Sequence, residues 1–449
     1  MLYAFVTNVL AVIVVLGVMI LIHELGHFLA AKYFGIRVHV FSFGFGPRLF
    51  GFKYGDTDYR VCLLPLGGYV KMAGENVGDK ASGDVDEFLS KPRWQRFIVA
   101  VMGPAMNIFL AIFLLTGLFM YRYQFPAYQE GPAVIGWVEE DSAADAAGFQ
   151  TGDRITRIGG NQDTEWRDIE LLIVSNPGSP LEVTVERDGQ LLTSTMTPRP
   201  EGRTRLGSAG WYPRMAAKLQ AVAPGLPAEQ AGMEAGDEIV SVDGVPVGFW
   251  PRISEILQTS EGKTLELGFL RNGELMATQI SPVHSTAPGD PQTKWRIGVA
   301  FQNDVITREL GFSGALSESL ATNKKFALLI FEVIGKIFSA EMSPRTLEGP
   351  IGIARLSGRA ARQSLGDLLS LMAAISLNLG IFNLFPIPVL DGGVILLLLV
   401  ESVMRRDLSL RIKERIMQAG FAFLLLIAAF VIYNDIVKAL PERFEKFFP

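Results

Sequence analysis

Four long apolar stretches constrain the fold most, because each is too long and too poor in charge for an ordinary core helix. They cover residues 10–22 with the uncharged residues before them, 97–120, 368–400 and about 416–437. A helix of about 20 apolar residues crosses a bilayer core. Hydrophobic residues also make up 49% of the 449-residue chain and charged ones only 19%. The sequence therefore predicts a polytopic α-helical membrane protein with four transmembrane helices. A cleaved signal peptide is the alternative for the first stretch, which lacks a basic start and a small-x-small cleavage site.

Basic side chains indicate the orientation, because short cytoplasmic loops carry an excess of Lys and Arg. They cluster between the first and second predicted spans and again between the third and fourth. Both loops are therefore predicted to be cytoplasmic, and residues 122–367 and both termini to lie outside. The net charge of -5 comes without a clustered basic face, which argues against nucleic acid as a partner. The single cysteine, Cys62, excludes an internal disulfide, so metal ligands would be His and carboxylate.

The segment between the second and third spans repeats itself at an offset of 84 residues. Residues 147–155 (AGFQTGDRI) align with residues 231–239 (AGMEAGDEI). The register continues further on: Gly160 with Gly244, Trp166 with Trp250, and Ile169 with Ile253. Each copy predicts a short helix, a Gly-Asp turn, a strand and a second helix. The AGxxxGDxI pattern resembles PDZ domains of the rearranged bacterial form, so we expect two tandem PDZ-like α+β domains. They could bind extended peptides along a sheet edge or act only as a steric filter.

A metal site is indicated where the first apolar stretch ends in His23-Glu24-Leu25-Gly26-His27, an H-E-x-x-H motif. On a helix, two histidines four residues apart project from one face and can bind one ion. Glu24 lies on an adjacent face, where it could take a proton from the attacking water as general base. A helix end that carries these side chains to the headgroups without a metal is the alternative. Ionisable groups at the end of an apolar span are costly without a function or a partner.

The third ligand is predicted to be Asp391, since a catalytic zinc usually has three protein ligands and an open position. This residue is the only acidic one within the apolar stretch 368–400, in the sequence NLFPIPVLDGG. Two prolines interrupt the helix there, which a membrane tolerates only against protein or a water-filled cavity. Capping of the following helix is the alternative role for this carboxylate. The other histidines, His39 and His284, are poorer candidates in the predicted topology.

These motifs together resemble the site-2 protease family (M50) of intramembrane metalloproteases, which pairs H-E-x-x-H on one helix with N-x-x-P-x-P-x-L-D-G on a later one. The resemblance covers nearly the whole chain, and residues 103–107 (GPAMN) match a further G-P-x-x-N signature. It implies one Zn²⁺ per chain, bound by His23, His27 and Asp391, with Glu24 as the catalytic residue. It also implies a multi-pass protein of the bacterial inner membrane, with the metal near the cytoplasmic side and the PDZ-like domains in the periplasm.

The resemblance further implies regulated intramembrane proteolysis of single-span membrane proteins within the lipid bilayer, in an envelope stress response. Substrates would be a pre-trimmed anti-sigma factor and remnant signal peptides. Asn383 would hold the substrate backbone, and residues 59–72 are predicted to form a membrane-associated β-hairpin. Within that hairpin, Gly68, Tyr69 and Val70 would present an edge to an unwound substrate. Purely structural roles remain the alternative for these four residues.

We expect four spans, at residues 1–31, 97–121, 368–401 and 416–437. A cytoplasmic-side loop with the hairpin, 32–96, follows the first span, and a cytoplasmic loop, 402–415, follows the third. Between the second and third spans we expect PDZ-like domains at 127–205 and 206–285 and a periplasmic segment at 286–367, and the tail covers 438–449. The periplasmic segment is predicted to contain amphipathic helices, either on the membrane surface or packed against protein. Two other functions compete with the protease. One is a catalytically silent PDZ membrane scaffold, and the other is a transporter built from inverted repeats, for which no matching pair of spans is evident.

Overall fold

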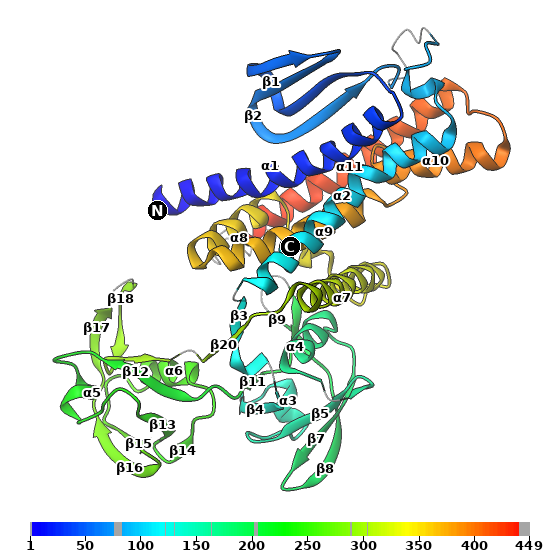
Figure 1. The fold of residues 1–449 in the computed structure, drawn as a ribbon. Coiled ribbons are helices and arrows are strands. Elements are labelled where there is room, and N and C mark those ends of the chain that lie inside the picture. Colours follow the sequence, from blue (N-terminus) through cyan, green and yellow to red (C-terminus); the bar gives the residue numbers. More distant parts are fainter. Residues whose placement is uncertain are drawn as a thin grey trace. The chain divides into compact units, whose positions relative to one another are not determined.

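The computed structural model describes residues 2–75, 83–121, 123–129, 131–162, 164–201, 205–287, 290–302 and 304–439 (Figure 1). The chain divides into two compact units. The membrane unit comprises Met1–Tyr123, Arg308–Gly335 and Leu347–Pro449, and the sheet unit comprises Gln124–Thr307 and Lys336–Thr346. The predicted tail, 438–449, lies almost wholly outside the described residues.

Helices form most of the membrane unit: α1 (Leu2–Tyr33), α2 (Arg93–Met120), α7 (Phe312–Phe338, up to Gly335 in this unit), α8 (Pro350–Gln363), α9 (Leu365–Asn383), α10 (Asp391–Met404) and α11 (Leu410–Ala439). Among the described residues, four segments are long and apolar enough to span a membrane: Val6–Tyr33, Arg93–Met120, Leu365–Asn383 and Arg411–Lys438. This confirms the predicted number. The predicted third span, 368–401, is interrupted where its two prolines predicted a break: α9 ends at Asn383, α10 begins at Asp391, and only Leu365–Asn383 is long enough to span a membrane.

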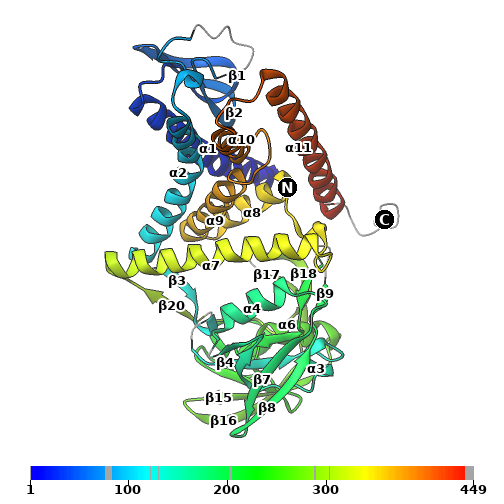
Figure 2. The same cartoon turned by 90° about the vertical axis from the view of Figure 1, so that its right-hand side faces the viewer.

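Helices α1, α2 and α9 form the packed centre of the membrane unit (Figure 2). Val15 and Met19 of α1 are buried against Leu110 of α2 and Met372 of α9. Helix α11 is the most exposed of the four spans. Only 6% of its most apolar stretch is buried, as expected for a helix that faces lipid. The predicted amphipathic segment does form helices, α7 and α8.

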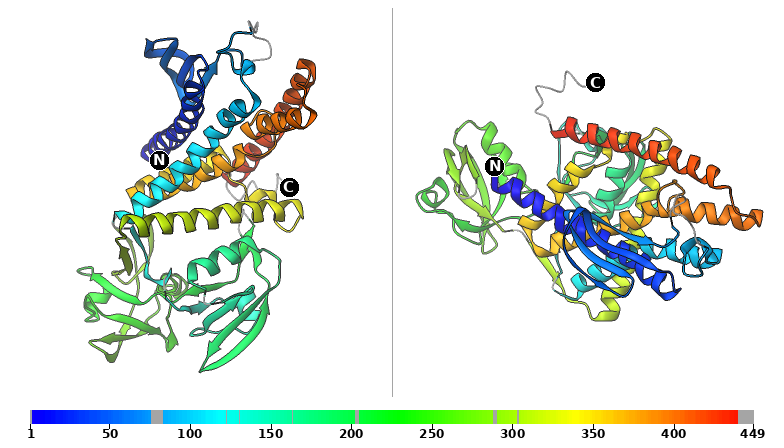
Figure 3. Two further views of the ribbon diagram at one scale, coloured as in Figure 1. Left: turned by 45° about the vertical axis from the view of Figure 1, so that its right-hand side comes forward. Right: turned by 90° about the horizontal axis from the view of Figure 1, so that it is seen from above.

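A small sheet precedes α2, made of β1 (Val38–Tyr54) and β2 (Thr57–Met72) (Figure 3). The predicted hairpin over residues 59–72 is wrong. Residues 38–43 of β1 pair on one side with the start of β2 and on the other with its end, so Phe41 faces both Tyr59 and Val70. The two halves of β2 therefore flank β1 rather than pair with each other. Gly67, at φ 134°, adopts a backbone angle in this bend that other residues rarely reach.

The sheet unit contains two modules with the same order of elements. The first has β4 (Ala133–Val138), α3 (Ala143–Ala146), β5 (Arg154–Ile158), β6 (Asn161–Gln162), α4 (Trp166–Ser175), β7 (Leu181–Arg187), β8 (Gln190–Met196) and β11 (Trp211–Pro213). The second has β12 (Ala217–Val222), α5 (Pro227–Gln230), β13 (Glu238–Val242), β14 (Val245–Pro246), α6 (Pro251–Thr259), β15 (Leu265–Arg271), β16 (Glu274–Ile280) and β19 (Val299–Phe301). The shorter ribbons are β9 (Arg199–Glu201) with β10 (Leu206–Ser208), β17 (Val283–Ala287) with β18 (Asp290–Arg296), and β3 (Tyr123–Pro126) with β20 (Val305–Arg308).

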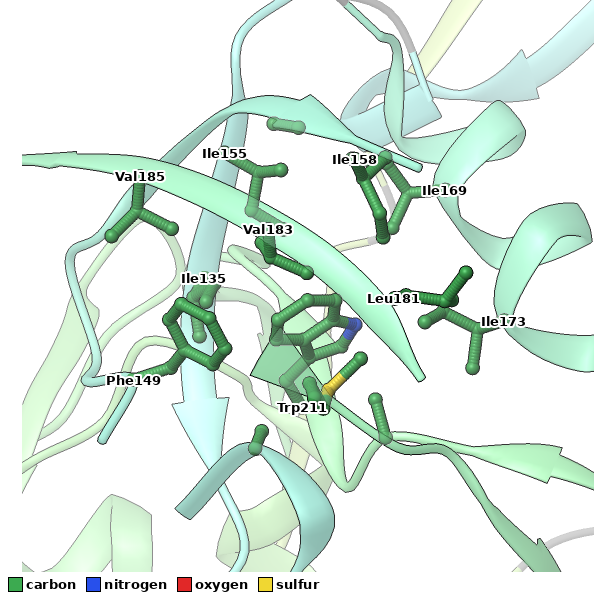
Figure 4. Close-up of a cluster of buried hydrophobic side chains, with 14 of the residues drawn as sticks. Ile135, Phe149, Ile155, Ile158, Ile169, Ile173, Leu181, Val183, Val185 and Trp211 are labelled. Carbon is green, nitrogen blue, oxygen red and sulfur yellow. The ribbon is translucent and has the colours of Figure 1, made fainter. Parts of the chain in front are cut away.

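Each module extends beyond its predicted boundary. The first sheet has the order β11-β4-β5-β7-β8 and the second β16-β15-β13-β12-β19. Trp211 of β11 lies in the core of the first module beside Phe149 and Ile135 (Figure 4), and Ile297, just before β19, is buried in the second core. The predicted limits of 127–205 and 206–285 therefore cut off the last strand of each sheet, because that strand joins only through long-range pairing.

Both modules contain the same ion pair between a buried Asp and a partly exposed Arg, which ties the Gly-Asp turn to a sheet strand. The Arg187 guanidinium contacts Asp153 at 2.6 and 2.7 Å and donates to the Gly148 carbonyl. In the second module, two of the three guanidinium nitrogens of Arg271, Nε and Nη2, donate to the Asp237 carboxylate at 2.8 Å each. Hydrogen bonds from Arg271 lower the pKa of the Asp237 carboxyl below its ordinary value. The repeat seen in the sequence is therefore also a repeat of side-chain contacts.

Candidate metal centre and active site

Three predicted ligands meet in the membrane unit although they are far apart in the sequence. His23 Nε2 lies 3.1 Å from Asp391 Oδ2, and His27 Nε2 lies 3.3 Å from Asp391 Oδ1. The two Nε2 atoms are 3.2 Å apart. All the ligand atoms lie within 4.8 Å of one another, a group that could hold a metal ion. Two imidazoles and one carboxylate form the donor set of a catalytic zinc site, which leaves one position open.

Helix α2 fixes the orientation of both histidine rings. His27 Nδ1 lies 2.8 Å from the Val99 carbonyl oxygen and donates to it, which leaves Nε2 as the free ligand atom. The amide nitrogen Nδ2 of Asn107 lies 3.1 Å from His23 Nδ1, while the amide oxygen is buried without a hydrogen-bond partner among the described residues. With His23 Nε2 facing Asp391, Nδ1 carries the proton, so we assign the amide in the flipped orientation, in which its oxygen accepts from Nδ1–H. Asn107 is fully buried, and Ser376 of α9 donates to its backbone carbonyl oxygen at 2.8 Å, so α9 supports the part of α2 that carries this amide.

Two glycines allow α1 and α2 to approach this closely. A Cβ atom at Gly26 would lie 2.1 Å from the Met102 carbonyl oxygen. At Gly103, a Cβ atom would lie 2.3 Å from His27 Nε2 and 2.9 Å from His23 Cε1. Real Cβ atoms do not come this near to other heavy atoms, because carbon atoms prefer separations of about 3.5 Å or more. Both glycines are thus required for the histidines to stand where they do.

Asp391 reaches the histidines from the first position of α10, directly after the helix break at residues 384–390. Capping does not explain this carboxylate, because Leu390 is the N-cap of α10 and no side-chain cap bond is present. Val389 has φ 85°, a rare conformation for a β-branched residue and one found at functional sites. Cβ atoms at Gly392 and Gly393 would lie 2.1 and 2.4 Å from carbonyl oxygens of the break. The prolines and glycines of the motif therefore aim one carboxylate at the histidines.

Glu24 stands beside the ligand group and is held by the β1–β2 sheet. Its Oε2 accepts the N–H of Val70 at 3.0 Å. Val70 belongs to residues 68–72, which pair with residues 38–43 on one side and with no other described strand, so they form an edge of this sheet. One backbone donor of the edge thus orients the carboxylate, which leaves its other oxygen for a proton.

A cavity of about 490 Å³ opens at this group. Its walls include His23, Glu24, His27, Asp391 and three of the predicted substrate-binding residues, Tyr69, Val70 and Asn383. Gly68, the fourth, is not in the wall, although a Cβ atom there would lie 3.5 Å from Glu24 Cγ. The structure therefore brings the predicted residues to one place, with Gly68 behind the edge rather than on its surface.

Charged side chains that we did not predict from sequence also form part of the wall: Glu75, Arg96, Glu401 and Lys413. Burial raises the pKa of the Glu75 carboxyl, which accepts the N–H of Met72 at 3.1 Å. Lys413 Nζ contacts the buried Glu401 Oε1 at 2.6 Å. Val99 was missed as well, and Asn107 was noted only as the end of the G-P-x-x-N signature, without a role at the site. A polar residue inside an apolar span signals function, so Asn107 could have been singled out, whereas a backbone carbonyl leaves no such signal.

Comparison with known proteins agrees with this geometry. The sequence model of peptidase family M50 matches residues 11–427. The regulator of sigma E protease of Haemophilus influenzae is 32% identical over 446 residues, covering 95% of this chain and 98% of its own. The regulator of sigma-E protease of Escherichia coli is 31% identical over 96% of this chain and 99% of its own. A protein of Neisseria meningitidis that is named a putative zinc metalloprotease is 30% identical over 96% of this chain and 99% of its own.

Among solved structures, the PDZ domain of an SdrC-like protein from Listeria monocytogenes is similar to part of this chain. The match covers 20% of this chain and 90% of the PDZ domain, at 16% sequence identity and a TM-score of 0.17. The match to the family model extends from the first span into the last one. It therefore includes both histidines of α1 and the carboxylate of α10. This chain belongs to peptidase family M50 and is a zinc metalloendopeptidase.

Proposed function

We propose that this chain hydrolyses a peptide bond in or near the transmembrane segment of single-span membrane proteins, with one Zn²⁺ bound by His23, His27 and Asp391. The convergence of these three side chains on one point inside the helical unit carries the proposal. The open wall beside them supports a catalytic rather than a purely structural metal. When bound, zinc lowers the pKa of water toward 7 and polarises a carbonyl group.

Glu24 acts as the general base and then as the general acid. Its carboxylate takes a proton from the attacking water and returns it to the leaving amine, so that the C–N bond breaks as a C–O bond forms. The hydrogen bond from the Val70 N–H holds one carboxylate oxygen in place during both transfers. Residues 68–72 present a sheet edge to an unwound substrate segment. The N–H groups of Val70 and Met72 are already bound to Glu24 and Glu75, so backbone carbonyl groups of this edge accept hydrogen bonds from the segment. Asn383, at the end of α9, holds the substrate backbone from the opposite wall.

The substrates we infer are membrane proteins already shortened outside, such as an anti-sigma factor, and remnant signal peptides. The names of the relatives from Haemophilus influenzae and Escherichia coli, regulators of sigma E, support this class. We place the metal site near the cytoplasmic side of the bacterial inner membrane, following the basic loops. The two modules of the sheet unit are then tandem PDZ-like domains in the periplasm that control access to the site.

The Glu24→Gln variant tests the mechanism. The amide keeps the size of the side chain but cannot take a proton, so cleavage of a co-expressed single-span substrate should fall by about 10²- to 10⁴-fold. Zinc content and folding in the membrane should stay unchanged. Glu414→Gln, at an exposed position on α11, is the matched control. Undiminished cleavage by Glu24→Gln would exclude this residue as the base, and full zinc affinity in Asp391→Ala would remove Asp391 from the ligand set.

A further inference from the structure

Arg96, in the first turn of α2, is a buried cation without a partner in the cavity wall. The residue is only 6% exposed, and its Nε is buried without a hydrogen-bond partner. No hydrogen bond or ion pair joins its side chain to any residue that the structure describes. Leaving a guanidinium out of water and unpaired is costly. A position that keeps such a group facing a cavity is therefore suited to an anionic ligand.

The other basic side chains at this end of the cavity are already paired. Arg93 contacts Asp407 at 2.8 Å. Hydrogen bonds from Arg93 lower the pKa of the Asp407 carboxyl, and the nearby charge of Arg96 lowers it further. Lys413 contacts Glu401, whose Oε1 also accepts the Leu408 N–H at 2.9 Å. Arg96 thus remains the basic group of this cluster that has no carboxylate bound to it.

We propose that Arg96 binds a carboxylate of the peptide in the cavity, first of all the α-carboxylate that hydrolysis creates. This inference rests on the protease activity. Every cleaved substrate ends in this group, whatever its sequence, because the acyl half of the broken amide leaves as a carboxylate and the other half as an amine. A guanidinium matches the two oxygens of a carboxylate through a pair of parallel N–H donors. Acidic side chains of the substrate offer the same chemistry.

The test uses the full-length, zinc-loaded protein in detergent and measures inhibition by peptides without acidic side chains. Each peptide is compared as the free C-terminal acid and as the C-terminal amide. The wild-type protein should prefer the acid. In Arg96→Gln this preference should fall by about tenfold to a hundredfold. Arg93→Gln is the matched control on the same helix turn, and because Arg93 lies outside the cavity wall, the preference should stay unchanged there.

A second pair of peptides, amidated at the C-terminus and carrying one Asp or one Asn, distinguishes the source of the carboxylate. An Arg96 effect on this pair alone assigns the site to an acidic side chain of the substrate. If Arg96→Gln does not fold, Arg96→Lys serves instead, since it keeps the charge but loses the paired donors, and it should lower the preference severalfold. The proposal is overturned if Arg96→Gln changes the preference within neither pair of peptides. It is also overturned if Glu401→Gln lowers the preference for the acid as much as Arg96→Gln does. Wild-type protein that cleaves nothing would instead contradict the proposed function.

Discussion

Replacing Gly103 by alanine should dismantle the metal site without unfolding the membrane unit. The new methyl group would stand 2.3 Å from His27 Nε2 and 2.5 Å from its Cε1. Because atoms of this kind prefer separations of about 3.5 Å, the ring would have to move by about 1 Å. Metal ligands tolerate deviations of only about 0.2 Å. We expect zinc affinity to fall by about a hundredfold or more, exceeding the usual effect of losing one supporting hydrogen bond.

The assay is zinc content after dialysis against a graded chelator, together with cleavage of a single-span substrate. Gly117→Ala is the control, since it lies on the same helix with nothing within 4 Å of the added Cβ. Alanine is the better helix former by about 1 kcal/mol, so this variant should be as stable and as active as the wild type. Wild-type zinc affinity in Gly103→Ala would refute the inferred contact between α2 and the histidines.

Two further perturbations test contacts away from the metal. Asp435 of α11 accepts N–H bonds from Gly349, Ile351 and Gly352 at 2.9, 2.8 and 3.1 Å and so caps α8. Asp435→Asn should lower the free energy of unfolding by about 2 kcal/mol. Proteolysis between α8 and α11 should then become faster, and unchanged proteolysis would count against the cap. In the second module, the lowered pKa of Asp237 stabilises the fold above the unfolded-state value of about 3.9 and stops doing so as pH falls through the folded value. The thermal stability of Asp237→Asn should therefore lie below that of the wild type at pH 7 and approach it in acid, once the pH falls below the folded-state pKa of Asp237, and a gap independent of pH would contradict this role.

The three side chains that converge in the membrane unit could be singled out from sequence because their signals are local. Helical spacing alone places His23 and His27 on one face, and Asp391 stands out as a carboxylate in an apolar stretch. The support from Val99 could not be foreseen, because it depends on the register in which α2 crosses α1, and no spacing along one helix encodes that register. Arg96 also seemed an ordinary basic residue at a membrane boundary until the fold showed it to be buried.

Strand pairing was the weak point for the same reason. Residues 59–72 have the composition of a hairpin, with glycines in the middle, and they do bend there. Their partners, however, are residues 38–43, which insert between the two halves. The last strand of each module shows the same limit, since Trp211 and Ile297 join their cores from beyond the predicted boundaries. The repeat of 84 residues could fix the elements within a module but not the strand that closes it.

The separation of the ligands along the chain also bears on how the enzyme is made. Helices α1 and α2, with both histidines and the residues that orient them, precede the sheet unit in the sequence, whereas Asp391 follows it. A ribosome therefore delivers the first half of the site early and completes the proposed ligand set only after the whole sheet unit has been synthesised. On the proposed ligand set, an unfinished chain would hold two histidines and no third ligand, and we expect it to be inactive while it is still being inserted.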